Sequence, residues 1–141
     1  MFRDRVVEYK AKAPLISIVD DDALARDGIC ELVESLGYQG VTFSSAEHFL
    51  QSSAIAETTC LITDMQMPGL NGLELQEALH SRGYQTPVIL ISAYPNEKHR
   101  TRALQNGAIG YLSKPFDESS LIECLTVAIE LQSSPARRRT A

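Results

Sequence analysis

Short apolar runs recur along the chain and alternate with longer segments of mixed polarity. Four of these runs are too short for a typical helix and mostly lack polar alternation, a pattern typical of strands buried on both faces. They span residues 15–19, 60–63, 88–91 and 109–112. A weaker run at residues 41–43 alternates around Thr42 and predicts an edge strand. The chain is therefore expected to contain five strands.

The segments between these runs have the apolar spacing of helices. They span about residues 23–36, 46–52, 73–82, 96–105 and 117–132. The apolar stripe of the first contains Leu24, Ile29, Leu32, Val33 and Leu36, and Gly37 follows as a left-handed stop. The pairs Ser44 with Glu47 and Asn71 with Glu74 have capping-box spacing, and Asp117 is expected to cap the last helix.

Alternating strands and helices predict a parallel sheet covered by helices on both faces. Right-handed crossovers favour a doubly wound, five-stranded α/β sheet of the flavodoxin-like type, with strand order 2-1-3-4-5. Ligands of such sheets bind outside the carboxyl ends of the strands, at the point where the strand order reverses. The residues that end the strands are therefore the candidate functional residues.

Carboxylates, hydroxyls and one ammonium group follow the predicted strands directly. They are Asp20, Asp21 and Asp22 after the first strand, Asp64 after the third, Ser92 after the fourth, and Ser113 with Lys114 after the fifth. Crowded carboxylates repel one another, and a divalent cation is the simplest remedy. Hard oxygen ligands without a nearby His or Cys favour Mg²⁺, with Mn²⁺ possible, over Zn²⁺. An ionised Asp is also a competent nucleophile toward phosphorus.

Composition limits the class of protein. The 141 residues suit one domain, with 44% hydrophobic and 22% charged residues. No segment approaches the roughly 20 apolar residues of a membrane span, and the N-terminus lacks the pattern of a secretory signal, so a cytoplasmic location is expected. The net charge of −5 disfavours direct DNA binding, although Arg137, Arg138 and Arg139 form a basic run. Cys30, Cys60 and Cys124 are expected to be buried thiols.

Four motifs stand at the predicted strands: IVDDD at 18–22, TDMQMPGLNG at 63–72, ILISA at 89–93 and YLSKPF at 111–116. Together they resemble the receiver domain of two-component response regulators. The resemblance covers about residues 14–132, and the four motifs together are highly specific. It implies a phosphoacceptor switch in phosphorelay signalling, not an enzyme, which accepts a phosphoryl group in a Mg²⁺-dependent reaction.

The resemblance also implies a role for each matching residue. Asp64 would be the phosphoacceptor. Asp20, Asp21 and Asp64, with the backbone carbonyl of Gln66, would hold the metal. Ser92 would be the switch hydroxyl, Lys114 the phosphate-binding lysine, and Tyr111 the aromatic residue that changes rotamer as Ser92 moves. The Lys114–Pro115 bond is cis in this family. Ser92 stands where Thr is commoner, and Gln66 and Tyr94 occupy positions that modulate dephosphorylation.

The expected organisation is an N-terminal extension at 1–13, the receiver domain at 14–132 and a disordered basic tail at 133–141. The tail is too short for a helix-turn-helix effector, so the chain is either a single-domain regulator or a fragment. The implied partners are a sensor histidine kinase or a phosphotransfer protein. A downstream partner, or a second copy, would use the face made of the fourth helix, fifth strand and fifth helix.

Two other functions are open at this point. A phosphatase of the haloacid-dehalogenase type would use Asp20 as nucleophile and Asp22 as acid. It also needs a late acidic pair for metal, but here Asp117 and Glu118 follow a Lys-Pro-Phe turn at a helix start, which is the wrong order. A flavin- or nucleotide-binding module would need a glycine-rich loop after the first strand, where three carboxylates stand instead. In a blander interpretation, Asp22 caps a helix and Tyr111 is an ordinary aromatic residue packed on the last helix.

Overall fold

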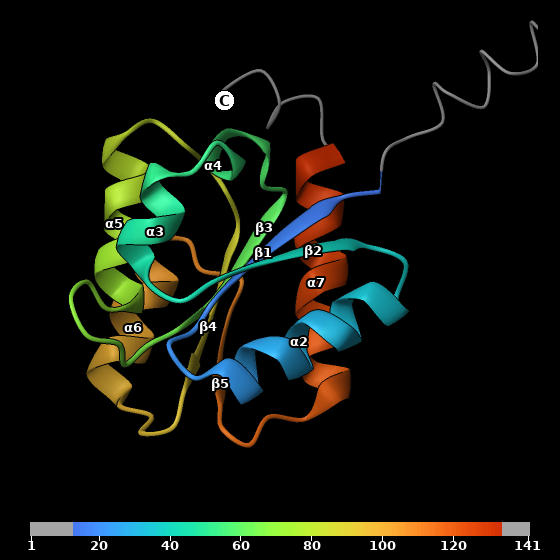
Figure 1. Cartoon of the computed structure of the whole chain (residues 1–141). Coiled ribbons are helices and arrows are strands. Elements are labelled where there is room, and N and C mark those ends of the chain that lie inside the picture. The colour runs from blue at the N-terminus through green and yellow to red at the C-terminus, as the bar shows by residue number, and fades with distance from the viewer. Residues whose placement is uncertain (1–12, 134–141) are drawn as a thin grey trace, which may run out of the picture.

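Five parallel strands form one sheet in the order β2-β1-β3-β4-β5 in the computed structural model, which describes residues 13–133 (Figure 1). The strands are β1 Leu15–Val19, β2 Gln39–Phe43, β3 Cys60–Asp64, β4 Val88–Ser92 and β5 Gly110–Ser113. Every residue of β3 and β4 is buried, as their unbroken apolar runs predicted. The predicted fold class and strand order are confirmed.

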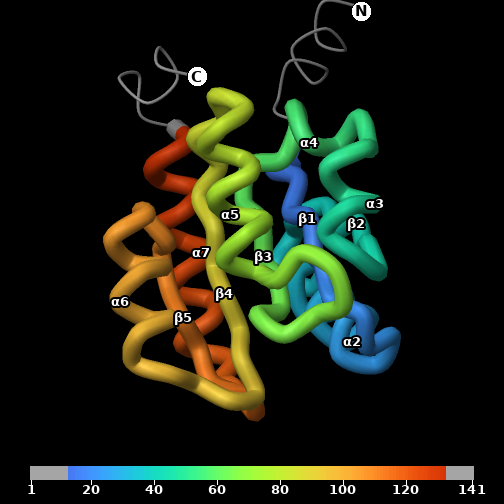
Figure 2. The backbone as a smooth tube through the Cα atoms, turned by 90° about the vertical axis from the view of Figure 1, so that its left-hand side faces the viewer, coloured from blue at the N-terminus to red at the C-terminus, as the bar shows by residue number. Residues whose placement is uncertain are grey.

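Helices cover both faces of this sheet. They are α2 Ala23–Ser35, α3 Ala46–Gln51, α4 Ala54–Glu57, α5 Gly72–Ser81, α6 Glu97–Gln105 and α7 Glu118–Ser133. One apolar cluster joins the sheet to α2 and α7, and a second joins it to the helices from α3 to α6. Figure 2 shows α5 and α6 in front of β4 and β5, with α7 behind. The two covered faces leave the strand ends as the accessible edge.

Local capping agrees with the sequence at two helices and differs at a third. The Asp22 carboxylate caps α2 by accepting from the Leu24 amide at 3.1 Å, and Asn71 with Glu74 forms the predicted capping box of α5. The predicted cap at Ser44 is wrong, because Ser45 caps α3 and accepts from the amide of His48. With Ser45 at the cap, Glu47 is one position short of the box.

The predicted apolar stripe of α2 was too wide. Ile29 and Val33 are buried, but Leu24 is 85% exposed and Leu36, at the C-cap, is 37% exposed. At about 100° per residue, Leu24 lies roughly 180° around the helix from Val33, so both cannot face the sheet. Gly37 does adopt the predicted left-handed conformation, with φ of 93°.

Other expectations have mixed outcomes. The one-turn helix α4 was not predicted. Of the three cysteines that were expected to be buried, Cys60 is buried, whereas Cys30 and Cys124 are only half-buried. Burial raises the pKa of all three free thiols. No helix within residues 13–133 has the length and apolar character needed to cross a membrane. The extension at 1–13 and the tail at 133–141, with Arg137, Arg138 and Arg139, lie outside the described residues except for Ala13 and Ser133.

Candidate acidic site at the strand ends

The carboxyl ends of β1, β3 and β5 bring three predicted residues together. The ammonium of Lys114 lies 2.8 Å from Asp64 Oδ1 and 3.1 Å from Asp20 Oδ2. Lys114 and Asp20 are 94 positions apart in the chain, so only the parallel sheet brings them together. The cis Lys114–Pro115 peptide bond that the resemblance implied is present at the end of β5.

The local backbone around Asp20 holds its side chain in place. Asp20 Oδ1 accepts from the amide of Asp22 at 2.9 Å, while the amide of Asp20 donates to the carbonyl of Phe43 at 3.1 Å. Arg26 of α2 also donates to the carbonyl of Asp20 at 2.9 Å. Both carboxylate oxygens of Asp20 are therefore engaged, one by a backbone amide and the other by Lys114.

Three carboxylates form a cluster that suits a hard divalent cation. Asp20, Asp21 and Asp64 each offer one oxygen, and these oxygens lie within 4.8 Å of one another. Oxygens that share a Mg²⁺ ion lie up to about 4.2 Å apart, so a small side-chain adjustment would complete the contact. Asp20 and Asp64 are 2% and 6% exposed, and Asp21 opens to solvent. The donor set therefore fits Mg²⁺, and its all-oxygen chemistry does not favour Zn²⁺.

The electrostatics of the site follow from burial and from one cation. Burial raises the pKa of Asp64, Asp20 adds to the rise, and Lys114 opposes it in part. Burial alone would lower the pKa of Lys114, but its contacts with Asp64 and Asp20 outweigh burial and raise that pKa. Lys114 is therefore positively charged at neutral pH. It faces the carboxyl group of Asp64, whose ionised form further positive charge would stabilise.

The loop after Asp64 turns back against β3. A Cβ atom at Gly72 would lie 2.7 Å from the carbonyl oxygen of Asp64, so this position requires glycine. The Gly72 amide donates to the Met65 carbonyl, and Glu47 of α3 accepts from the amide of Leu70 at 2.9 Å. This hydrogen bond lowers the pKa of Glu47. The loop is thus fastened to α3 by a contact that the sequence did not indicate.

Ser92 ends β4 with a fully buried side chain. Its hydroxyl contacts the side-chain amide of Gln66, with Gln66 Nε2 at 2.9 Å and Oε1 at 3.1 Å. The amide of Tyr94 also donates to Ser92 Oγ at 3.1 Å. Gln66 was predicted to act through its backbone carbonyl, and that role stays a prediction. The side-chain contact was missed, although the predicted neighbourhood of the third and fourth strands was a signal for it.

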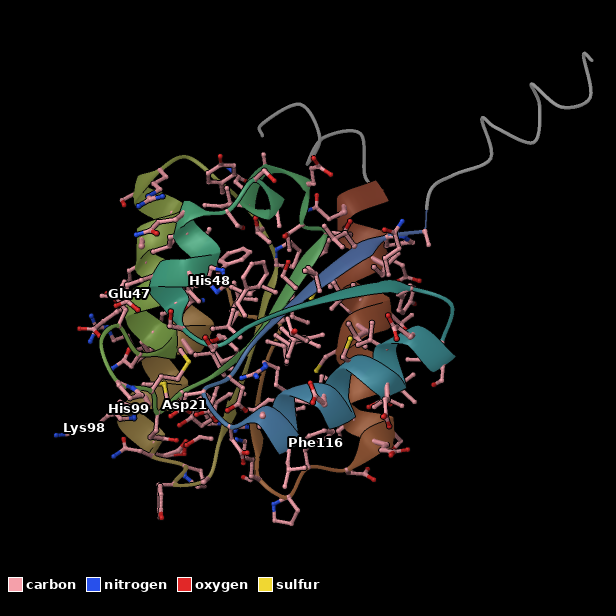
Figure 3. All side chains as sticks on the ribbon, viewed as in Figure 1. Asp21, Glu47, His48, Lys98, His99 and Phe116 are labelled. Carbon is pink, nitrogen blue, oxygen red and sulfur yellow. The ribbon has the colours of Figure 1, made fainter. Side chains whose placement is uncertain are left out.

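Tyr111 is buried in β5 on the side of α6. It belongs to the apolar cluster that includes Ala103 of α6, which argues against the alternative that it is an ordinary aromatic residue packed on the last helix. The Arg100 guanidinium lies 6.0 Å from the ring centroid and donates to the Tyr111 carbonyl at 3.2 Å. The Tyr111 hydroxyl is buried and makes no hydrogen bond to the described part of the chain. Figure 3 places His99 of α6 at the same lower end of the molecule as Asp21.

Asp22 does not join the acidic cluster. Its carboxylate is exposed and accepts from the amide of Leu24 at 3.1 Å, so Asp22 acts as a helix cap. The haloacid-dehalogenase alternative needed Asp22 as a catalytic acid and Asp20 as a free nucleophile. Neither side chain is placed for that role, because Asp20 is held by Lys114 and by the amide of Asp22.

Fold and site together define a doubly wound α/β domain whose acidic ligand site lies at the carboxyl ends of β1 and β3. The sequence model of the response regulator receiver domain family matches residues 16–126, so the chain belongs to that family. Receiver domains are signalling switches that bind Mg²⁺ at an acidic pocket and interact with histidine kinases or phosphotransfer proteins. The flavin and nucleotide alternative is not supported.

Curated relatives and solved structures agree with this assignment. The chain is 32% identical over 127 residues to the transcriptional regulatory protein TdiR of Thauera aromatica, covering 90% of this chain and 56% of TdiR. It is 35% identical to the response regulator protein TodT of Pseudomonas putida, covering 92% and 56%. The structure of the response regulator StyR superposes with a TM-score of 0.83 at 34% identity, covering 91% and 65%. The chain thus spans about half the length of these curated relatives.

Proposed function

We propose that this receiver domain accepts a phosphoryl group on Asp64, from a histidine kinase or a phosphotransfer protein, and thereby controls a partner. The observation that carries the proposal is the position of Lys114, whose ammonium lies 2.8 Å from an Asp64 oxygen and 3.1 Å from Asp20. A fixed cation beside a buried carboxylate is what a phosphoryl group requires, because its equatorial oxygens are negatively charged.

Asp64 acts as the nucleophile in this proposal. One of its carboxylate oxygens forms a bond to phosphorus while the bond between phosphorus and the donor imidazole nitrogen breaks. The electron pair leaves with that nitrogen, which takes a proton from solvent. Hydrolysis later returns the carboxylate and releases inorganic phosphate. Asp64 suits this role better than Asp20, because both oxygens of Asp20 are already engaged.

Asp20, Asp21, Asp64 and the backbone carbonyl of Gln66 are the proposed metal ligands, and the cluster of the three carboxylate oxygens supports the assignment of the aspartates. A bound Mg²⁺ supplies positive charge to the phosphoryl oxygens. Asp21 is the exposed member and is proposed as a direct ligand, while the more enclosed Asp20 acts through water. Lys114 holds the opposite side of the phosphoryl group.

The proposed output face consists of α6, β5 and α7. Ser92 and Tyr111 lie on adjacent strands, and Arg100 of α6 contacts both the ring and the carbonyl of Tyr111. A movement of Ser92 toward a phosphoryl group would free space that Tyr111 can enter, and Arg100 would carry the change to α6. A downstream protein or a second copy would bind there. Direct DNA contact is not proposed for a chain of net charge −5.

The test uses acetyl phosphate as donor with Mg²⁺ and locates the modified residue by mass spectrometry. Wild type should be labelled on Asp64 and Asp64→Asn should not be labelled. Asp22→Asn is the matched control, because Asp22 is a nearby carboxylate that caps α2 and should leave labelling intact. Full labelling of Asp64→Asn at Asp20 would replace this proposal with the phosphatase mechanism.

The three free thiols suit a reducing compartment, so the proposed location is the cytoplasm.

A further inference from the structure

The hydroxyl of Ser92 is fully committed to neighbours. A serine hydroxyl has one hydrogen to donate and two lone pairs to accept. Gln66 Nε2 lies 2.9 Å from Ser92 Oγ and the Tyr94 amide lies 3.1 Å from it, so both lone pairs have donors. Gln66 Oε1, at 3.1 Å, takes the hydroxyl hydrogen. No hydrogen-bonding capacity is left over for a fourth group.

The Gln66 side chain reaches Ser92 because of the strand register. Asp64 pairs with Ile91 across β3 and β4, and the amide of Met65 donates to the carbonyl of Ile91 at 2.8 Å. The next residue, Gln66, therefore starts the loop directly beside Ser92. Its amide carries a donor and an acceptor in one planar group, so it can satisfy both sides of the same hydroxyl.

We propose that Gln66 is a positioning residue that holds the Ser92 hydroxyl in the unmodified protein, so that switching begins when this contact is exchanged for a phosphoryl oxygen. The inference rests on the proposed function, because it takes Asp64 as the phosphoacceptor. It assigns Gln66 a side-chain role that is separate from the metal-binding role proposed for its backbone carbonyl. Gln66 would act through Ser92 and not through the phosphoryl group itself.

The exchange has a predictable effect on ligand affinity. A ligand shifts a two-state equilibrium only through contacts that differ between the states. In wild type, a phosphoryl mimic must displace Gln66 Oε1 from the Ser92 hydroxyl. In Gln66→Met, the side chain keeps its length but loses both hydrogen-bonding atoms, so the buried hydroxyl hydrogen of Ser92 has no partner until the mimic binds. We expect beryllofluoride to bind roughly threefold to tenfold more tightly to Gln66→Met, the range that one net hydrogen bond supplies.

The experiment is a double-mutant cycle. Beryllofluoride is titrated in saturating Mg²⁺ into wild type, Gln66→Met, Ser92→Ala and the double variant, and binding is followed by amide NMR shifts. The tightening caused by Gln66→Met should vanish in the Ser92→Ala background, where no hydroxyl exists to hold. Equal tightening in both backgrounds would mean that Gln66 acts on the ligand directly, and no tightening or weaker binding in the wild-type background would also overturn the inference.

A second measurement needs no phosphoryl mimic. Amide hydrogen exchange of the unmodified protein should speed up at Tyr94 in Gln66→Met, because Ser92 Oγ, the acceptor of that amide, loses its fixed position. The control Gln51→Met makes the same replacement at an exposed position on α3 and should leave Tyr94 unchanged. Unaltered exchange at Tyr94 in Gln66→Met would refute the positioning role. Failure of the Asp64 proposal is distinguishable, since beryllofluoride would then bind Asp64→Asn as well as wild type.

Discussion

Two ion pairs of nearly equal length lie in different surroundings. Lys114 and Asp64 meet at 2.8 Å with side-chain exposures of 24% and 6%, whereas Arg102 of α6 and Glu77 of α5 meet at 2.6 Å with 58% and 38%. The first pair sits among buried carboxylates at the strand ends, and the second bridges two helices at the surface. Water screens the second pair and only partly screens the first. The distance between the charged atoms therefore does not tell which ion pair is the stronger interaction, whereas the burial of the side chains does.

The comparison has a functional meaning. Lys114 of the buried pair contacts two carboxylates, those of Asp64 and Asp20, so the site holds more negative charge than this one cation can balance. That imbalance is what makes the site receptive to a metal ion. At the surface, Glu77 also accepts from Asn106, at 3.4 Å, and no charge is left to recruit a ligand. We expect substitutions at the buried pair to change the rate at which Asp64 is phosphorylated. Substitutions at the surface pair should change only the stability of the protein, and only slightly.

The largest effect is expected for Lys114→Met, which removes the cation from the buried pair. Labelling of Asp64 by acetyl phosphate should slow by about 100-fold, the usual cost of losing one charged group that faces a developing negative charge. Initial rates of phosphoprotein formation measure this. Lys114→Arg is the control, because it keeps the positive charge and should recover part of the rate. A Lys114→Met rate within a few fold of wild type would contradict the role given to this cation.

The second effect separates two exposed neighbours, Asp21 and Asp22. Asp21→Ala removes a carboxylate of the cluster and should weaken Mg²⁺ binding by roughly tenfold or more. Asp22→Ala removes the cap of α2 and should lower the free energy of unfolding by about 1 kcal/mol, with little change in Mg²⁺ affinity. Calorimetric Mg²⁺ titration and urea unfolding of both variants provide the two measurements. Equal loss of Mg²⁺ affinity in both variants would remove the distinction between ligand and cap.

Much of this site could be predicted from sequence, because strand endings are local features. The run 18–22 and Asp64 mark the edge of the sheet, and the strand order then brings them together. Hydrogen bonds that a side chain makes to a distant segment of the chain could not be predicted in the same way. The Gln66–Ser92 and Glu47–Leu70 hydrogen bonds depend on strand register and on the path of one loop. No local pattern of residues specifies either.

The predictions for Leu24 and for the segment of α4 failed for a different reason. An apolar residue near a helix end was assigned to the buried stripe although its angular position opposes Val33. The segment Ala54–Glu57 is only one turn long, too short for helical periodicity to be recognised. Its buried residue, Ile55, packs in the same cluster as α3, so tertiary contact defines this turn.

The third effect concerns pH and metal removal. Because burial raises the pKa of Asp64, its ionised form destabilises the metal-free protein. The stabilising preference for the protonated carboxyl is complete below the unfolded-state pKa and is lost as pH rises through the higher folded-state pKa. In EDTA at pH 7, Asp64→Asn should therefore have a higher Tm than wild type, and the difference should shrink as the pH falls toward 4. Thermal unfolding across that pH range, with the exposed carboxyl variant Asp22→Asn as control, measures it. A Tm difference that grows on acidification would contradict the sign.

The smallest effect is expected at the surface pair. Arg102→Ala should lower the free energy of unfolding by less than about 1 kcal/mol, because an exposed ion pair gains little attraction and costs side-chain entropy. The effect should shrink further in 0.5 M salt, where screening is strong over a few ångströms. Urea unfolding at low and high salt measures both, and Glu77→Gln should behave in the same way. A loss comparable to that of a buried ion pair, about 3 kcal/mol, would show that α5 and α6 depend on this contact. Burial would then no longer rank the two pairs.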